Sequence, residues 1–213
     1  MIHVLYTSIN VENHKKIIDH YLPDFSAEYQ DKIKRYRRWQ DAQLSLLGRI
    51  LLVKGLEQIN YGFDESNLNY TSFNKPYLEN NAIHFNISHS GELVVCALTK
   101  IGAIGIDIEK INGTKISDFK SQMTVNEWKL INESTNANLS FFQYWTQKEA
   151  VIKTHGKGLS IPLKSFEVTK NKTIIESELY FLKELKINDD YCCHLALKEN
   201  IDTIEIITEK INF

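Results

Sequence analysis

Two acidic residues lie two positions apart in a stretch of alternating character. Residues 104–109 read Ile-Gly-Ile-Asp-Ile-Glu, and apolar residues at every second position predict a strand with one buried face. Asp107 and Glu109 then share the other face, with Cα atoms about 6.6 Å apart. Carboxylate oxygens are preferred ligands of Mg²⁺ and Mn²⁺, and the small Gly105 beside the pair predicts room for a ligand. A solvated polar strand face is the alternative that this spacing leaves open.

A third carboxylate, Glu149, lies in a stretch of helical periodicity. Phe142, Trp145, Glu149 and Lys153 fall near one face at intervals of three and four residues. Glu149 could therefore join the acidic pair, with Lys148 and Lys153 supplying positive charge for an anionic substrate. An ordinary helix pair between Glu149 and Lys153, worth about 0.2–0.5 kcal/mol, is the alternative.

Other positions could contact phosphate groups. His89 lies among turn-forming residues at 88–92, where an imidazole could reach a phosphate or carry a proton near neutral pH. Lys75 precedes Pro76 in a region typical of a loop. A dense basic run follows the first predicted helix, and a solvated helix face is its alternative interpretation. The run comprises Lys32, Lys34, Arg35, Arg37 and Arg38.

The elements that would position these residues are predicted from periodicity, caps and turn formers. Residues 60–81 predict a loop, and a meander of strands is expected after Phe166. The earlier strands are expected at 2–9, 83–87, 93–98 and 103–109, the second and third forming a hairpin through 88–92. The helices are expected at 11–22, 41–59, 124–130 and from Ser140 to Gly156.

Composition is typical of a folded domain with a core. The chain has 213 residues, 43% of them hydrophobic, and a net charge of −2, which argues against bulk nucleic-acid binding. No apolar run approaches the roughly 18 residues of a membrane span, and no basic segment precedes the short apolar start. Three cysteines, Cys96, Cys192 and Cys193, fit no disulfide framework or zinc spacing. We therefore expect a cytoplasmic protein without membrane or nucleic-acid partners.

Three central segments, in order and spacing, resemble the signatures of the 4′-phosphopantetheinyl transferases. Nearly the whole chain takes part in the resemblance, including Lys75-Pro76 and residues 156–160. The length is similar to that of the surfactin-synthetase-activating class rather than the half-length, trimeric holo-acyl-carrier-protein synthases. The three segments are Phe85-Asn86-Ile87-Ser88-His89-Ser90, Gly105-Ile106-Asp107-Ile108-Glu109 and residues 145–153, Trp-Thr-Gln-Lys-Glu-Ala-Val-Ile-Lys.

The resemblance implies an activity and its main participants. Members transfer 4′-phosphopantetheine from coenzyme A to a serine of an apo acyl or peptidyl carrier protein and release 3′,5′-ADP. Asp107, Glu109 and Glu149 match the family's metal ligands for Mg²⁺, with Mn²⁺ also possible. Glu149 also matches the position that accepts the serine proton, and Lys153 matches a cation that holds the phosphates, so Asp107, Glu149 and Lys153 are the expected catalytic residues.

The resemblance also implies substrate contacts. Lys75, Ser88 and His89, with Lys153, match positions near the coenzyme A phosphates, and Ser45 matches a hydroxyl-bearing position. Lys32 matches a contact of the 3′-phosphate, whereas Tyr29 stands where relatives often carry a second lysine. Carrier docking in this class uses the stretch after the metal strand, where Phe119 and Met123 are the apolar candidates; packing in the core is their alternative role.

The fold implied by the resemblance is α+β, a pseudo-dimer of two similar halves that each pack an antiparallel sheet against a long helix. The expected division is 1–104, with the coenzyme A contacts, and 105–213, with the metal site and carrier docking. We expect a monomer that binds coenzyme A between the halves. A non-catalytic module that binds coenzyme A or carriers, and a metal-dependent phosphohydrolase, are the alternatives.

Overall fold

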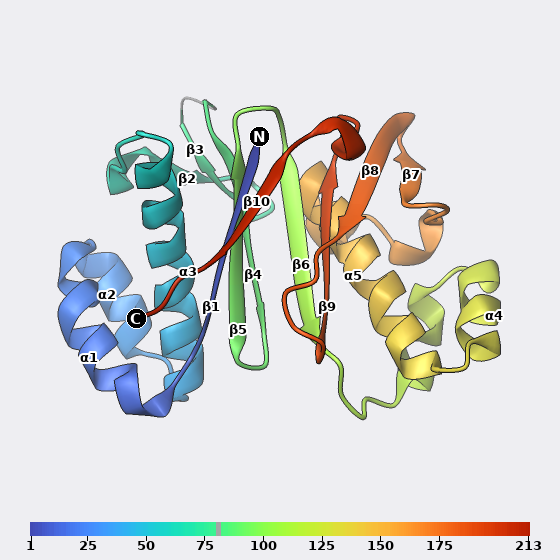
Figure 1. Cartoon of the computed structure of the whole chain (residues 1–213), viewed down its shortest axis with the longest axis horizontal. Coiled ribbons are helices and arrows are strands. Elements are labelled where there is room, and N and C mark those ends of the chain that lie inside the picture. Colours follow the sequence, from blue (N-terminus) through green and yellow to red (C-terminus); the bar gives the residue numbers. More distant parts are fainter. Residues whose placement is uncertain (80–81) are drawn as a thin grey trace.

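The computed structural model describes residues 1–79 and 82–213, which form helices and sheets in two groups (Figure 1). Asn80 and Asn81, at the end of the predicted loop, lie outside the described residues. The helices are α1 (Val11–Tyr21), α2 (Ala27–Lys34), α3 (Trp39–Gln58), α4 (Val125–Glu133) and α5 (Ala137–His155). The strands are β1 (Ile2–Ser8), β2 (Leu68–Tyr70), β3 (Pro76–Leu78), β4 (His84–Ser90), β5 (Leu93–Thr99), β6 (Ile104–Lys110), β7 (Lys172–Ile175), β8 (Glu178–Glu184), β9 (Tyr191–Leu197) and β10 (Ile206–Lys210).

Two four-stranded sheets each carry one long helix, which confirms the predicted α+β class. The first sheet has the order β10-β1-β5-β4 and packs against α3, and the second has the order β6-β9-β8-β7 and packs against α5. Strands β7, β8 and β9 form the expected meander, but β10 returns to the first sheet and pairs in parallel with β1 (Figure 1). The division at residue 104 stays a prediction, and β10 crosses it.

The face of β6 that carries Ile104, Ile106 and Ile108 is fully buried in a core shared by the two sheets. This core also contains Val4 of β1 and Val95 of β5, so it joins the halves through aliphatic packing. The alternation of β6 therefore places its acidic residues on the opposite face, as the sequence predicts. In the structure this face lies toward α5. No helix in the described part of the chain has the length and apolar character that a membrane span requires.

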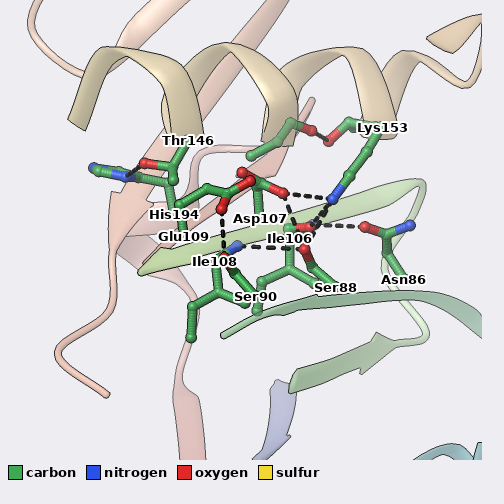
Figure 2. Close-up of polar contacts among 12 residues, drawn as sticks. Asn86, Ser88, Ser90, Ile106, Asp107, Ile108, Glu109, Thr146, Lys153 and His194 are labelled. Atoms are coloured by element: carbon green, nitrogen blue, oxygen red, sulfur yellow. Dashed lines mark hydrogen bonds and ion pairs between the residues drawn. The ribbon is translucent and has the colours of Figure 1, made fainter. Parts of the chain in front are cut away.

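Strands β4 and β6 lie side by side, yet they belong to different sheets. Side chains of β4 replace the backbone ladder: Asn86 Oδ1 accepts the Ile106 N–H at 2.9 Å, Ser88 Oγ accepts the Ile108 N–H at 3.4 Å, and Ser90 Oγ accepts the Lys110 N–H at 3.2 Å. These contacts, which we call the side-chain ladder, satisfy alternate amides along β6. They connect the two halves directly beneath α5 (Figure 2).

Three local predictions are wrong for identifiable reasons. Residues 88–90 continue β4 rather than forming a turn, and the reversal is confined to Gly91-Glu92, where Gly91 has φ +55°. The 60–81 region contains the short strands β2 and β3, paired with each other. Helix α5 begins at Ala137 instead of Ser140, because the Asn136 side chain accepts the Leu139 N–H and caps it.

Gly105 provides space for a helix and not for a ligand, which corrects the prediction from sequence. A Cβ on Gly105 would lie 2.2 Å from the Ala150 carbonyl oxygen and 2.5 Å from the Thr154 nitrogen, both backbone atoms of α5. Backbone atoms cannot rotate away as a flexible side chain does. The absence of a side chain at this position therefore sets how closely α5 approaches β6.

Gly105→Ala should therefore push α5 away from β6. We expect a loss of about 1–3 kcal/mol in the free energy of unfolding, as for overpacked core positions, measured by urea denaturation. Gly113→Ala is the matched control, because a Cβ there would meet no atom within 4 Å. Equal stability of the two variants would contradict this account of Gly105.

Candidate active site

The acidic pair of β6 lies beneath α5 and beside β4 (Figure 2). Asp107 is 3% exposed, and its Oδ1 accepts a hydrogen bond from Ser88 Oγ at 2.9 Å and an ion pair from Lys153 Nζ at 2.6 Å. Glu109 Oε2 accepts a hydrogen bond from Ser90 Oγ at 2.5 Å. The same serines that hold the β6 amides therefore also hold the two β6 carboxylates.

Lys153 on α5 brings the positive charge to this cluster. Besides Asp107, its ammonium donates to Ser88 Oγ at 3.0 Å and to the Ile106 carbonyl at 3.3 Å. The lysine therefore connects α5, β4 and β6 at one point. Its pairing with a nearly buried carboxylate offsets part of the free energy of removing that charge from water.

The pKa values show that three carboxyl groups interact here. Burial raises the pKa of Asp107, opposed mainly by Lys153. Burial also raises the pKa of Glu109, with Ser90 opposing and Asp107 reinforcing the rise. The pKa of Glu149 rises to about 7, first through burial and then through the charge of Asp107; Lys153 opposes this rise and Glu109 adds to it. Glu149 is therefore close enough to both acids of β6 for their charges to couple.

The donor set has the chemistry of a site for a hard divalent cation. Buried Asp107 Oδ2 has no hydrogen-bond partner among the described residues, so one lone-pair position of the cluster is unused. Carboxylate oxygens are the ligands that Mg²⁺ prefers. Within residues 1–79 and 82–213, no three or more His, Cys, Asp or Glu side chains are grouped so as to hold a metal ion. Convergence of the three acids on one ion therefore stays a prediction.

Lys148 does not supply charge to this site, contrary to the sequence-based interpretation. It is fully buried, pairs with Glu127 Oε2 at 2.8 Å and donates to the carbonyls of Leu163 and Phe166. Glu127 in turn completes the predicted capping box of α4 with Thr124. The pair fixes α4 and the 163–166 segment to the outer side of α5.

The predicted coenzyme A contacts are distributed over both halves. Ser88 is buried in the cluster, and His89 is exposed on β4, where partial burial of the ring and the Lys153 charge lower its pKa. Ser45 is half-buried on α3. The ammonium of Lys75 binds backbone carbonyls, the nearest being Lys153 O at 2.6 Å. The role of each residue toward coenzyme A stays a prediction.

A pocket of about 400 Å³ beside α2 contains Lys32 together with Arg49, a residue that the sequence pattern did not single out. Arg49 is 8% exposed; its guanidinium lies 4.3 Å from the centre of the Tyr29 ring and pairs with Glu65 at 3.1 Å. Tyr29, which replaces the expected second lysine, is buried and donates its hydroxyl hydrogen to the Ser45 carbonyl. Arg49, on α3, thus adds a second cation to the pocket beside Lys32 and lies against the Tyr29 ring.

The two candidate docking residues differ in exposure. Met123 is 5% exposed and belongs to a core cluster with Ile131 and Phe142. Phe119 is half-buried, with its ring 5.3 Å from that of Trp145. Phe119 is therefore partly available to a carrier protein, whereas Met123 is buried. The docking role of each residue stays a prediction.

Comparison with known proteins agrees with this arrangement. A family model described as the 4′-phosphopantetheinyl transferase superfamily matches residues 103–198, and one described as 4′-phosphopantetheinyl transferase, N-terminal, matches residues 14–100. The 4′-phosphopantetheinyl transferase gsp of Aneurinibacillus migulanus is 37% identical over 81% of this chain and 73% of its own length. The 4′-phosphopantetheinyl transferase Sfp of Bacillus subtilis is 34% identical over 70% and 68%.

A mouse L-aminoadipate-semialdehyde dehydrogenase-phosphopantetheinyl transferase is also similar, 31% identical over 66% of this chain and 51% of its own. The chain belongs to the 4′-phosphopantetheinyl transferase superfamily. Within it, the chain is a transferase of the Sfp type. Coenzyme A is the donor and carrier proteins are the acceptors of the phosphopantetheine group, so neither the non-catalytic module nor the phosphohydrolase is supported.

The raised pKa of Glu149 predicts a pH-dependent effect on stability. Because the folded pKa is about 7 and the ordinary value is 4.5, ionisation of Glu149 destabilises the fold progressively as the pH rises through this range. In buffer with a chelator, Glu149→Gln should exceed the wild type in free energy of unfolding by about 1–3 kcal/mol at pH 8. The difference should shrink toward pH 4.5, and a difference independent of pH would contradict the assignment.

Proposed function

We propose that Asp107, Glu109 and Glu149 bind Mg²⁺, or Mn²⁺, and that this site is where the phosphopantetheine group is transferred. The observation that carries the proposal is the pair of β6 carboxylates fixed by Ser88 and Ser90 beneath Glu149 and Lys153. A divalent cation bound there would offset the negative charge of a diphosphate and of the departing nucleotide.

The reacting groups follow from the chemistry of a diphosphate whose anhydride bond is broken. The acceptor serine oxygen forms a bond to the phosphorus that bears pantetheine, the bond from that phosphorus to the nucleotide oxygen breaks, and 3′,5′-ADP leaves. Glu149 accepts the serine proton, directly or through water; its pKa is about 7 without a cation, and a bound cation would lower this value, so the carboxylate is ionised near neutral pH and can act as a base. Lys153, at the junction of α5 with β4 and β6, turns its ammonium to the phosphates.

The remaining coenzyme A contacts are proposed along the junction of the halves. Ser88 and His89 would meet the phosphates from β4, and Ser45 would approach from α3. Lys32 would hold the 3′-phosphate, with Arg49 as the buried cation behind it in the same pocket. We assign carrier docking to the segment around half-buried Phe119, with Met123 supporting it from the core.

We further propose that the protein acts as a monomer in the cytoplasm. One chain supplies both sides of the proposed site, β4 from the first sheet and β6 and α5 from the second. The three cysteines are buried free thiols, as is usual in a reducing compartment.

The transfer is tested by mass spectrometry of apo acyl and peptidyl carriers incubated with the enzyme, coenzyme A and Mg²⁺. We expect Asp107→Asn to retain the circular dichroism spectrum of the wild type and to lose at least about 100-fold in transfer rate, because an anionic ligand of the proposed cation, which offsets the charge of the phosphates, is lost. Asp202→Asn, at an exposed acid outside both the cluster and the docking segment, is the control. Near-normal turnover of Asp107→Asn in Mg²⁺ would refute the proposed metal site.

Binding of the 3′-phosphate is tested with a donor that lacks this group. 3′-Dephospho-coenzyme A should be a poorer substrate, and Lys32→Ala should raise the KM for coenzyme A by about tenfold while changing the KM for the dephospho donor less than twofold. Lys16→Ala, an exposed lysine of α1, controls for net charge. Equal rates of transfer from coenzyme A and from the dephospho donor would contradict the proposed contact with the 3′-phosphate.

A further inference from the structure

The ammonium of Lys75 reaches from the first half of the chain into the second. Lys75 directly precedes β3, yet its Nζ donates to Lys153 O at 2.6 Å, to Ile104 O at 3.3 Å and to Thr154 O at 3.5 Å. Two of these carbonyls belong to the last turn of α5, and the third belongs to the first residue of β6. One side chain therefore binds the ends of both elements that carry the acidic cluster.

These carbonyls need a donor from outside their own elements. The last four carbonyls of an α-helix have no intrahelical partner, and a cation there also meets the negative end of the helix dipole. The Gly156 N–H already returns to Ile152 O and does not serve the carbonyls of Lys153 or Thr154. Lysine often caps such an end. Here the cap comes from 78 residues earlier in the chain.

The surroundings hold Lys75 in this position. Thr71 organises the turn that presents it: the Thr71 hydroxyl accepts the Lys75 N–H at 3.1 Å, and the Thr71 N–H donates to the Lys75 carbonyl at 2.9 Å. The stem runs beside Gly156, where a Cβ would lie 3.7 Å from Lys75 Cδ. Burial of the ammonium lowers its pKa to about 8, which agrees with a group enclosed between the halves.

We propose that Lys75 is a positioning residue that clamps the end of α5 to the start of β6, and so sets the place of Lys153 and Glu149 relative to Asp107 and Glu109. The inference rests on the catalytic roles proposed for those four residues. In this role the Lys75 ammonium does not contact a phosphate of coenzyme A, which is the role that the resemblance implies. Its N–H groups donate to backbone carbonyl oxygens instead.

The clamp is tested first without substrate or metal, by amide hydrogen exchange. In Lys75→Met, which keeps the length of the stem, the amides at 155–156 should exchange at least about tenfold faster, because local opening at the end of α5 becomes easier. Lys75→Arg should restore most of the protection, since the guanidinium offers five donors. Exposed Lys100→Met, for which the described residues give no ion pair or hydrogen bond, is the control. Unchanged exchange in Lys75→Met would overturn the clamp.

Steady-state kinetics then separate positioning from substrate binding. For Lys75→Met we expect kcat to fall about tenfold while the KM for coenzyme A changes less than threefold, with recovery in Lys75→Arg. A rise in the KM for coenzyme A of tenfold or more at constant kcat would show a phosphate contact and overturn the proposal. Faster exchange with unchanged kcat would show a structural cap without an effect on catalysis, and would also overturn it. Absence of transfer by the wild type would refute the proposed function but leave the exchange result intact.

Discussion

The arrangement of the site depends on side-chain oxygens of β4 acting where backbone carbonyls act in a sheet. Asn86, Ser88 and Ser90 each accept one amide of β6, and an unpaired buried amide would cost about 1–3 kcal/mol. A hydroxyl has one donor and two acceptor positions, so each serine can bind an amide and also donate to a carboxylate. A backbone ladder could satisfy the amides but could not hold Asp107 and Glu109. The joint between the sheets and the orientation of the acids are therefore the same set of contacts (Figure 2).

Charge balance explains why such a site suits a cation together with a phosphate ester. Burial raises the pKa of Glu149, the charges of Asp107 and Glu109 raise it further, and Lys153 opposes them as a nearby positive charge. A diphosphate would meet net repulsion from three ionised acids. A divalent cation removes this conflict, because it lowers the cost of ionising the acids and attracts the phosphates. The unpartnered Oδ2 of Asp107 agrees with a ligand position that protein groups leave open.

The sequence predicted the alternating β6 strand, with both acids on one face, and the long helix ending at Gly156, because these depend on local periodicity and caps. Prediction from the sequence was wrong where the local preference of a residue conflicts with the contacts that it makes in the folded chain. The segment from Ser88 to Ser90 is rich in turn formers, but its side chains are needed at the joint and keep it extended. The pattern predicts that Lys148 supplies charge to the site and does not single out Arg49, because it does not reveal the specific partners that allow these cations to be buried. Gly105 and the return of β10 to β1 depend on contacts between distant segments, which no local pattern encodes.

The two halves are joined so that catalysis and folding depend on the same contacts. Isoleucines of β6 share a core with Val4 and Val95, which fixes the separation of the sheets without directional bonds. Hydrogen bonds then limit the remaining movement of the halves relative to each other: the side-chain ladder fixes β6 along β4, and Lys75 holds the end of α5. Packing alone tolerates small shifts of a helix along a strand, whereas transfer chemistry is sensitive to displacements of about 1 Å. A fold assembled from two similar units therefore needs polar contacts at their junction, because reacting groups from both units must meet with more accuracy than aliphatic packing provides.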